Sequence, residues 1–208
     1  MKTDFLPAQD PETLLYALAV LRRGGLVAFP TDTVYGVGAM AFNDDAVKRI
    51  YTAKQRTVEK AIPVLIADPA DLPKVTQELP PFAVRLADRF WPGPLTLVLA
   101  KHPGLPMSVS AGPTVAIRVP DHPVARSLLR CAGPLAVTSA NLSGQPNPST
   151  AQEVCAQLGG RIALIVDGGQ TPGGVPSTLV DCSGAEPRIL REGPVTKAEI
   201  WAELGLGF

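Results

Sequence analysis

Short apolar runs alternate with helical segments along nearly the whole chain, and this alternation restricts the fold more than any other feature. Several of the runs are too continuous for strands with one face in water, so we expect a largely buried sheet. The predicted strands cover residues 26–29, 62–67, 95–100, 115–119, 135–137, 162–166 and 179–180. Strands that alternate with helices predict a layered α/β domain, in which helices cover a twisted sheet.

Capping signals mark where the helices begin. Asp10-Pro11 predicts a helix start, because a side-chain cap precedes proline at the first helical position. The buried stripe of this helix is predicted to be Leu14, Leu15, Leu18 and Leu21. Asn43 is predicted to cap a second helix that ends near Lys54. Further helices are expected at 81–90, 123–130, 151–158 and 197–204. The link 101–114 is too short to hold a crossover helix, which predicts a mixed sheet.

Composition bounds the class of protein. The 208 residues fit one domain, so we expect a single unit over residues 1–208. Nineteen basic residues balance nineteen acidic ones, which disfavours binding to an extended polyanion. Cysteines are odd in number and lack metal-ligand spacing, as expected for thiols in a reducing compartment. No apolar run is long enough to span a bilayer, and no signal core follows Met1, so we expect a cytoplasmic protein without membrane contact.

Several common catalytic motifs are absent from the sequence. Glycine is never followed by lysine, which excludes a P-loop. Gly36 and Gly38 lack the third glycine of a dinucleotide-binding fingerprint. His102 and His122 are the only histidines, and His122 at a predicted helix start is interpreted as a turn residue rather than a base. Any chemistry must therefore depend on positioning and charge.

Polar residues follow the first predicted strand of residues 26–29. The segment 30–36 reads Pro-Thr-Asp-Thr-Val-Tyr-Gly and places hydroxyls and a carboxylate at a strand end, where α/β proteins commonly bind ligands. Thr31 and Thr33 point to the same side if the segment is extended. The alternative is a polar turn whose hydroxyls satisfy its own backbone.

Cations gather between residues 46 and 60. Lys48, Arg49, Lys54, Arg56 and Lys60 lie in this stretch against one acid, which indicates either a small-anion site or a solvated helix face. A planar guanidinium beside a compact ammonium suits a polyphosphate, because the two groups bind oxygens in different geometries.

Two later segments complete the pattern. Arg118 ends an apolar strand and needs an anionic partner, which is either a ligand or a structural Asp or Glu. Ser139 and Asn141, two positions apart after another strand, face one way and offer donors and acceptors. Together, the three segments predict a cleft for an anionic ligand.

These segments resemble the YrdC family, whose best-characterised members are threonylcarbamoyl-AMP synthases. The similarity extends from about Leu14 to Glu192 and includes Lys54-x-Arg56 and Ser139-x-Asn141. It implies a three-layer α/β fold with a twisted, mixed sheet. It also implies synthesis of L-threonylcarbamoyl-AMP from ATP, L-threonine and bicarbonate with release of pyrophosphate, assisted by Mg²⁺ held mainly by the phosphates. The product would pass to a separate threonylcarbamoyl transferase complex that modifies tRNA.

The same resemblance assigns residues to ligands by matching positions. It implies catalytic roles for Lys54 and Arg56 and no protein ligand for the metal. The positions matched to ATP are Arg56, Lys60, Thr114, Asn141, Ser149 and Arg191. The positions matched to threonine are Thr33, Arg118, Ser139 and Ser177.

The chain departs from the family pattern at two positions. Thr57 stands where many members have proline, and Leu65 stands where many long members have a threonine-binding histidine, which short bacterial members commonly lack too. Longer members carry a second C-terminal domain, and 208 residues imply the single-domain type.

Two alternatives remain from the sequence. One is a family paralogue that binds nucleotide or RNA without making the adenylate. The other is a carbamoyl-phosphate-using relative from hydrogenase maturation, which would also carry acylphosphatase and zinc-finger modules. Neutral charge and 5% aromatic residues limit direct binding of tRNA or double-stranded RNA to a weak secondary activity.

Overall fold

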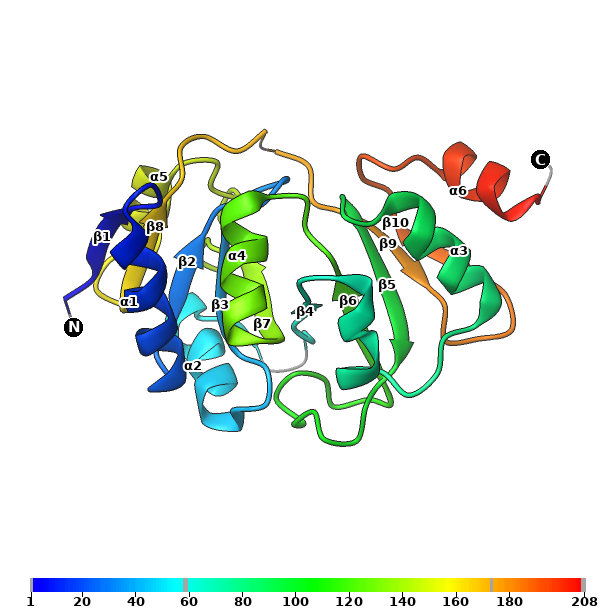
Figure 1. The fold of residues 1–208 in the computed structure, drawn as a ribbon, viewed down its shortest axis with the longest axis horizontal. Helices are drawn as coiled ribbons and strands as arrows, with labels where there is room; N and C mark the ends of the chain where they lie inside the picture. Colours follow the sequence, from blue (N-terminus) through cyan, green and yellow to red (C-terminus); the bar gives the residue numbers. More distant parts are fainter. Residues whose placement is uncertain (1, 58–59, 173, 207–208) are drawn as a thin grey trace.

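The computed structural model describes residues 2–57, 60–172 and 174–206 and contains one ten-stranded mixed sheet (Figure 1). The strand order is β1-β8-β2-β3-β7-β4-β6-β5-β9-β10. The strands are β1 (Asp4–Pro7), β2 (Val27–Phe29), β3 (Gly36–Met40), β4 (Val64–Leu65), β5 (Leu95–Ala100), β6 (Thr114–Arg118), β7 (Leu135–Ser139), β8 (Leu164–Asp167), β9 (Thr178–Asp181) and β10 (Arg188–Arg191). The sheet contains both parallel and antiparallel strand pairs, so the expectation of a mixed sheet is confirmed.

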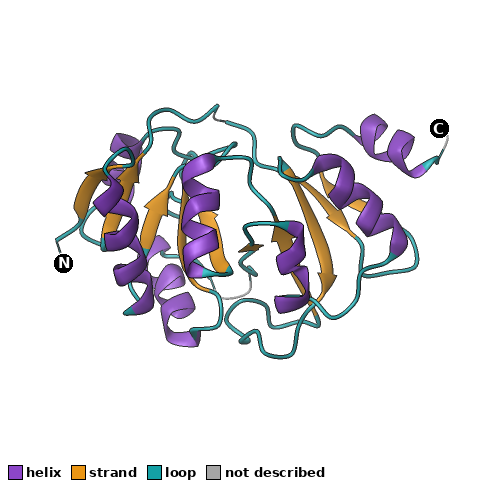
Figure 2. Cartoon of the chain, viewed as in Figure 1, coloured by secondary structure: helices purple, strands orange, loops and turns teal. Residues whose placement is uncertain are grey.

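Helices cover both faces of the sheet (Figure 2). They are α1 (Pro11–Arg22), α2 (Asp44–Lys54), α3 (Pro81–Phe90), α4 (Pro123–Ala132), α5 (Ala151–Leu158) and α6 (Lys197–Leu204), with a 3-10 helix, η1, at Pro69–Lys74. The helices α1 and α4 contribute to one apolar cluster, whereas α2, α3, α5 and α6 contribute to a second, larger cluster. The predicted α/β class and helix-flanked sheet are therefore confirmed.

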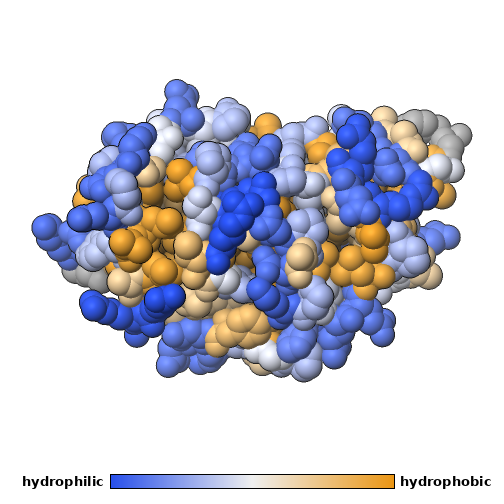
Figure 3. Space-filling view, viewed as in Figure 1, coloured by the Kyte–Doolittle hydropathy of each residue, from blue (hydrophilic) through white to orange (hydrophobic). Residues whose placement is uncertain are grey.

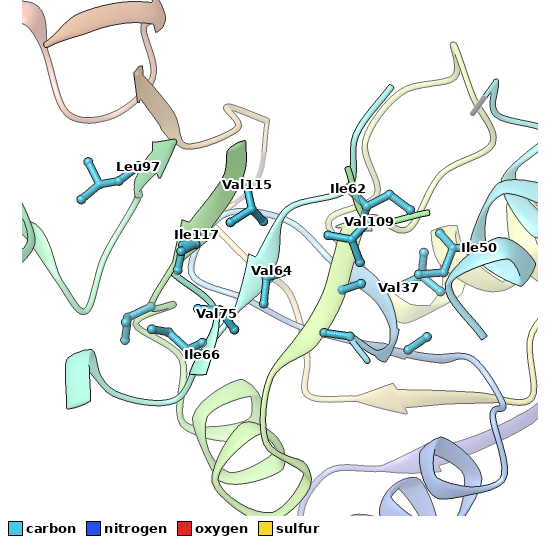
Figure 4. Close-up of a cluster of buried hydrophobic side chains, with 14 of the residues drawn as sticks. Val37, Ile50, Ile62, Val64, Ile66, Val75, Leu97, Val109, Val115 and Ile117 are labelled. Atoms are coloured by element: carbon cyan, nitrogen blue, oxygen red, sulfur yellow. The ribbon is translucent and has the colours of Figure 1, made fainter. Parts of the chain in front are cut away.

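Side-chain alternation along the strands divides the two clusters. In β2, Val27 and Phe29 belong to the α1–α4 cluster and Ala28 to the larger cluster. The same division recurs in β7 and β8, because successive side chains of a strand point to opposite faces. Figure 4 shows part of the larger cluster, where Val64 and Ile117 extend from neighbouring strands toward other buried aliphatic residues.

The structure corrects several details of the predicted elements. β1, β3, β10 and η1 were not predicted, and the strand expected at 62–67 is confined to β4. The buried residues of α1 are Thr13, Ala17 and Leu21, whereas Leu15 is 67% exposed. The predicted stripe is therefore correct for Leu21, partly correct for the half-buried Leu14 and Leu18, and wrong for Leu15, because a wide apolar stripe does not say which of its residues meets the sheet.

The visible surface carries several separate apolar patches among hydrophilic side chains (Figure 3). No helix in the described part of the chain combines the length and the hydropathy needed to cross a membrane. The described cysteines Cys131, Cys155 and Cys182 are unpaired.

Candidate active site

A cavity of about 440 Å³ lies against the middle of the sheet. Its lining includes alternate residues of neighbouring strands, such as Thr114, Ala116 and Arg118 in β6 and Thr96 and Val98 in β5. Alternation brings these side chains to one face, while Ile117 and Leu97 point into the larger apolar cluster behind them. The volume is in the range of small-molecule sites.

The charge of the lining residues is entirely positive. Arg56, Arg118 and Arg191 line the cavity, and the described lining includes no Asp or Glu. Burial lowers the pKa of Arg191, and the neighbouring Arg118 lowers it further. Asp32 partly offsets the charge of Arg118, whereas Arg56 and Arg191 donate to carbonyl groups and keep their charge to attract anions.

Arg118 is held in a fixed orientation by three contacts. Its Nε donates to the Gly93 carbonyl at 3.0 Å, Nη1 to Thr33 Oγ1 at 3.0 Å, and Nη2 to Asp32 Oδ1 at 2.6 Å. The structural carboxylate that the sequence left open as the arginine's partner is therefore Asp32. Burial lowers the pKa of Arg118, whereas Asp32 opposes this shift.

The Thr31–Thr33 segment combines a turn with a surface that faces the cavity. Thr31 Oγ1 accepts from the backbone N–H groups of Thr33 and Val34 and donates to the Val34 carbonyl at 2.7 Å. Its only proton is thus used, so Thr33 donates in the 3.1 Å contact between the two hydroxyls. Both side chains point the same way as predicted, and both line the cavity.

On the opposite side, Ser177 and Arg191 are joined through the backbone. Arg191 donates from Nε and Nη2 to the Ser177 carbonyl at 3.2 and 2.8 Å, and the Ser177 hydroxyl lies 2.7 Å from that of Thr96. Gly193 allows the segment after Arg191 to pack closely against the backbone of residues 176–178. A Cβ there would lie 2.4 Å from the Pro176 carbonyl oxygen and 2.6 Å from the Thr178 nitrogen.

Arg56 reaches the cavity because α2 ends abruptly before it. Gln55 caps the helix in the left-handed region at φ 52°. Arg56 then donates to the carbonyls of Lys60 and Ala61 at 3.0–3.2 Å. These contacts hold the guanidinium beside the segment that enters β4.

Lys54 is buried and is not among the residues that line the cavity. Its Nζ donates to the carbonyls of Ser139 and Asn141 and to Asn141 Oδ1, and the residue is 1% exposed. Burial lowers the pKa of this ammonium to about 7, and Arg56 contributes in the same direction. The Lys54 side chain thus connects the end of α2 to the loop after β7.

Most of the predicted site residues gather in one place. Seven line the cavity: Thr33, Arg56, Thr114, Arg118, Ser139, Ser177 and Arg191. Lys54 and Asn141 lie beside it and contact Ser139, whereas Lys60 is exposed. Ser149 lines a neighbouring pocket, which shares Asn147 with the cavity.

The cationic stretch 46–60 does not act as one anion site. Lys48 pairs with Asp44 at 2.6 Å, and Arg49 donates to the Gly24 carbonyl at 2.8 Å. Glu59 lies outside the described residues. Lys48 and Arg49 are both exposed, as the alternative of a solvated helix face predicts.

Sequence reasoning missed other lining residues. Thr96 is an isolated hydroxyl within the apolar run 95–100, and this interruption was a usable signal. Leu65, noted only as a departure from the family pattern, also lines the cavity beside Val137 and gives it an apolar wall. Asn147 had no signal beyond its turn-rich surroundings.

The described residues contain no group of three or more His, Cys, Asp or Glu side chains placed to hold a metal ion.

Comparisons with known proteins find relatives over most of the chain. Residues 19–193 match the Sua5/YciO/YrdC family model, described as telomere recombination. The chain is 50% identical over 98% of its length to the threonylcarbamoyl-AMP synthase of Bacillus subtilis and covers 59% of that protein. It is 44% identical over 91% of its length to the Pyrococcus abyssi synthase and covers 56% of it. The chain thus spans less than two thirds of these relatives.

A solved structure extends the similarity to three dimensions. The crystal structure of P. abyssi Sua5 complexed with L-threonine matches with a TM-score of 0.93 at 40% identity, covering 99% of this chain and 61% of that one.

Proposed function

The chain belongs to the Sua5/YciO/YrdC family, and on this basis we propose that it makes L-threonylcarbamoyl-AMP from ATP, L-threonine and bicarbonate. The observation that carries the proposal is the cavity itself, where Arg56, Arg118 and Arg191 surround hydroxyl groups, Asp32 pairs with Arg118 alone, and the described lining includes no Asp or Glu. The synthase names of the relatives and the threonine complex of P. abyssi Sua5 support it.

The two substrates are assigned to different parts of the cavity. Arg118, with Thr33, Ser139 and Ser177 around it, would bind threonine, with the guanidinium at its carboxylate. Arg56, Arg191 and Thr114 would bind ATP, and Lys60 and Ser149 would extend this surface. Leu65 and Val137, which line the cavity, would supply apolar contact for the threonine methyl group.

The reaction requires no protein nucleophile. The unprotonated threonine amine would first attack the carbon of bicarbonate and form a carbamate with loss of water, and a carbamate oxygen would then attack the α-phosphate of ATP. The bond from the α-phosphorus to the bridging oxygen breaks, and pyrophosphate leaves. Arg56 and Arg191 would stabilise negative charge that develops on the phosphates, and fixed positioning of the carbamate would lower the barrier by as much as about 7 to 11 kcal/mol.

Magnesium fits the proposal as an ion carried by ATP. It prefers phosphate and water oxygens, and the described lining offers it no carboxylate. The ion would also neutralise part of the negative charge on the leaving pyrophosphate. The product would be a mixed anhydride of the carbamate with AMP, which is an activated donor. The family resemblance makes a separate transferase complex that modifies tRNA in the cytoplasm its proposed consumer.

Mass spectrometry of the products tests the proposal directly. The protein is incubated with ATP, Mg²⁺, threonine and bicarbonate, with each component omitted in turn. We expect threonylcarbamoyl-AMP and pyrophosphate only when threonine and bicarbonate are both present. ATP turnover that ignores both would contradict synthesis and favour a nucleotide-binding paralogue.

A further inference from the structure

The hydrogen bonds around Lys54 and Asn141 determine which way the Ser139 hydroxyl proton points. A lysine ammonium has three N–H donors and no acceptor. Lys54 Nζ has three acceptors, namely the Ser139 carbonyl, the Asn141 carbonyl at 2.5 Å and Asn141 Oδ1 at 3.1 Å. Each donor of the ammonium therefore has a partner inside the protein.

The Asn141 side chain has one consistent orientation. Its Nδ2 donates to the carbonyls of Leu142 at 3.0 Å and Gln145 at 2.6 Å, while Oδ1 faces Lys54 and Ser139. A flipped amide would place its NH₂ group against the ammonium and its oxygen against two carbonyls. The partners thus assign the amide atoms.

Ser139 must then donate its proton away from the cavity. Its hydroxyl lies 2.5 Å from Asn141 Oδ1, which has no proton to give. Only oxygen lone pairs of Ser139 remain for a ligand. The Thr33 hydroxyl has likewise used its proton inside the protein, because it donates to Thr31 and accepts from Arg118.

We propose that Lys54 is a positioning residue that acts through Asn141 to keep Ser139 a hydrogen-bond acceptor, so that the ligand group facing Ser139 must be a donor. The inference rests on the proposed function only in naming that ligand as threonine. Two groups of threonine supply the required chemistry, the amine and the hydroxyl. Lys54 does not contact phosphate in this arrangement.

Calorimetric binding of threonine and two analogues tests the polarity of Ser139. In 2-amino-3-fluorobutyrate a fluorine replaces the hydroxyl and has no proton, whereas 3-hydroxybutyrate lacks the amine. We expect the analogue without the donor facing Ser139 to bind at least about tenfold more weakly than threonine. The ratio of the analogue's Kd to the Kd of threonine should fall at least about fivefold in Ser139→Ala, as in a double-mutant cycle. Unchanged ratios for both analogues in Ser139→Ala would overturn the proposal.

Lys54→Met tests the positioning role. We expect the same ratio of Kd values to fall toward one, because the Asn141 amide and the Ser139 hydroxyl can then reorient. ATP affinity should change less than about threefold. A tenfold or greater loss of ATP affinity with an unchanged analogue ratio would show instead that Lys54 binds phosphate.

Acetylation of the unaltered protein avoids dependence on the folding of Lys54→Met. Mass spectrometry should find Lys54 unmodified with and without ATP, whereas exposed Lys197 reacts in both conditions. Modification of Lys54 that ATP prevents would overturn the proposal. If threonine does not bind the unaltered protein, the proposed substrate is wrong, and the acetylation pattern still decides whether Lys54 contacts phosphate.

Discussion

Arg118 and Asp32 form an almost completely buried ion pair at one end of the cavity. Nη2 and Oδ1 are 2.6 Å apart, with the two side chains 8% and 13% exposed. A buried cation that loses its partner is costly, typically by about 3 to 5 kcal/mol. Asp32→Ala should therefore lower the free energy of unfolding by about that amount in urea denaturation.

The exposed pair of Arg188 and Asp181 provides the control. Their side chains are 75% and 20% exposed, so Arg188→Ala should cost less than about 1 kcal/mol. Equal losses for Asp32→Ala and Arg188→Ala would show that burial of the first pair does not determine its contribution.

Arg56→Ala should weaken ATP binding more than it weakens the fold. The guanidinium lines the cavity and also donates to two backbone carbonyls, so we expect at least a tenfold loss of ATP affinity with a stability change of about 1 kcal/mol. Arg22→Ala, at the exposed end of α1, is the matched control and should change neither quantity. Unchanged ATP affinity in Arg56→Ala would remove this arginine from the phosphate site.

Gly193→Ala should distort the contact between Ser177 and Arg191. The added Cβ meets backbone atoms at 2.4 to 2.7 Å, which requires movement of one segment and costs about 1 to 3 kcal/mol. We also expect weaker binding of both ATP and threonine, measured by calorimetry. Gly184→Ala is the control, because its nearest neighbour would be 3.9 Å away. Unchanged affinities for ATP and threonine in Gly193→Ala would show that the Ser177 and Arg191 segments can move apart without affecting the cavity.

The low pKa of Lys54 predicts a pH-dependent stability. Its pKa is about 7 in the folded protein, against an ordinary value of 10.5, so between these values the unfolded chain binds more protons. Stability from this residue therefore rises with pH above 7 and is lost below it. Urea denaturation from pH 6.5 to 9 should show the unaltered protein gaining stability relative to Lys54→Met.

Lys48→Met is the control on the same helix. The ion pair with Asp44 raises the pKa of Lys48 above its ordinary value, which places its titration outside this pH range. A pH-independent difference between the unaltered protein and Lys54→Met would contradict the lowered pKa.

Substrate selectivity follows from the hydroxyl groups of Thr33, Ser139 and Ser177 around the cavity. A pocket built to hydrogen-bond a substrate hydroxyl rejects the analogue without it by about four to five orders of magnitude. Valine should thus be a very poor substrate, whereas serine loses one methyl group and about 1 to 3 kcal/mol. The measurement is kcat/KM at one bicarbonate concentration, and valine outperforming serine would contradict hydroxyl recognition.

Local signals in the sequence predicted the helices and much of the site well. Asp10 and Asn43 cap their helices with side-chain hydrogen bonds as expected, and polar residues at strand ends lead to the cavity. β3 was missed because Gly36–Met40 lacks the β-branched residues that favour strands apart from Val37, and its pairing with β2 and β7 is non-local.

The direction of the Lys54 side chain was beyond sequence reasoning for a similar reason. A lysine before Gln55-Arg56 has the appearance of a phosphate ligand, and its true partners lie 85 and 87 residues away. Only the tertiary structure brings the Ser139 and Asn141 carbonyls to the end of α2.

The distribution of the cavity over β6, β7, β9 and the segment after β2 links ligand binding to folding of the entire sheet. No single hairpin contains Thr33, Arg118, Ser139 and Ser177 together, so a partly folded chain has no complete site. Ligand at about one hundred times its Kd should then add about 2.7 kcal/mol to global stability. Protection from proteolysis would extend to β1 and β10, at the far edges of the sheet, and not only to the segments that touch the ligand.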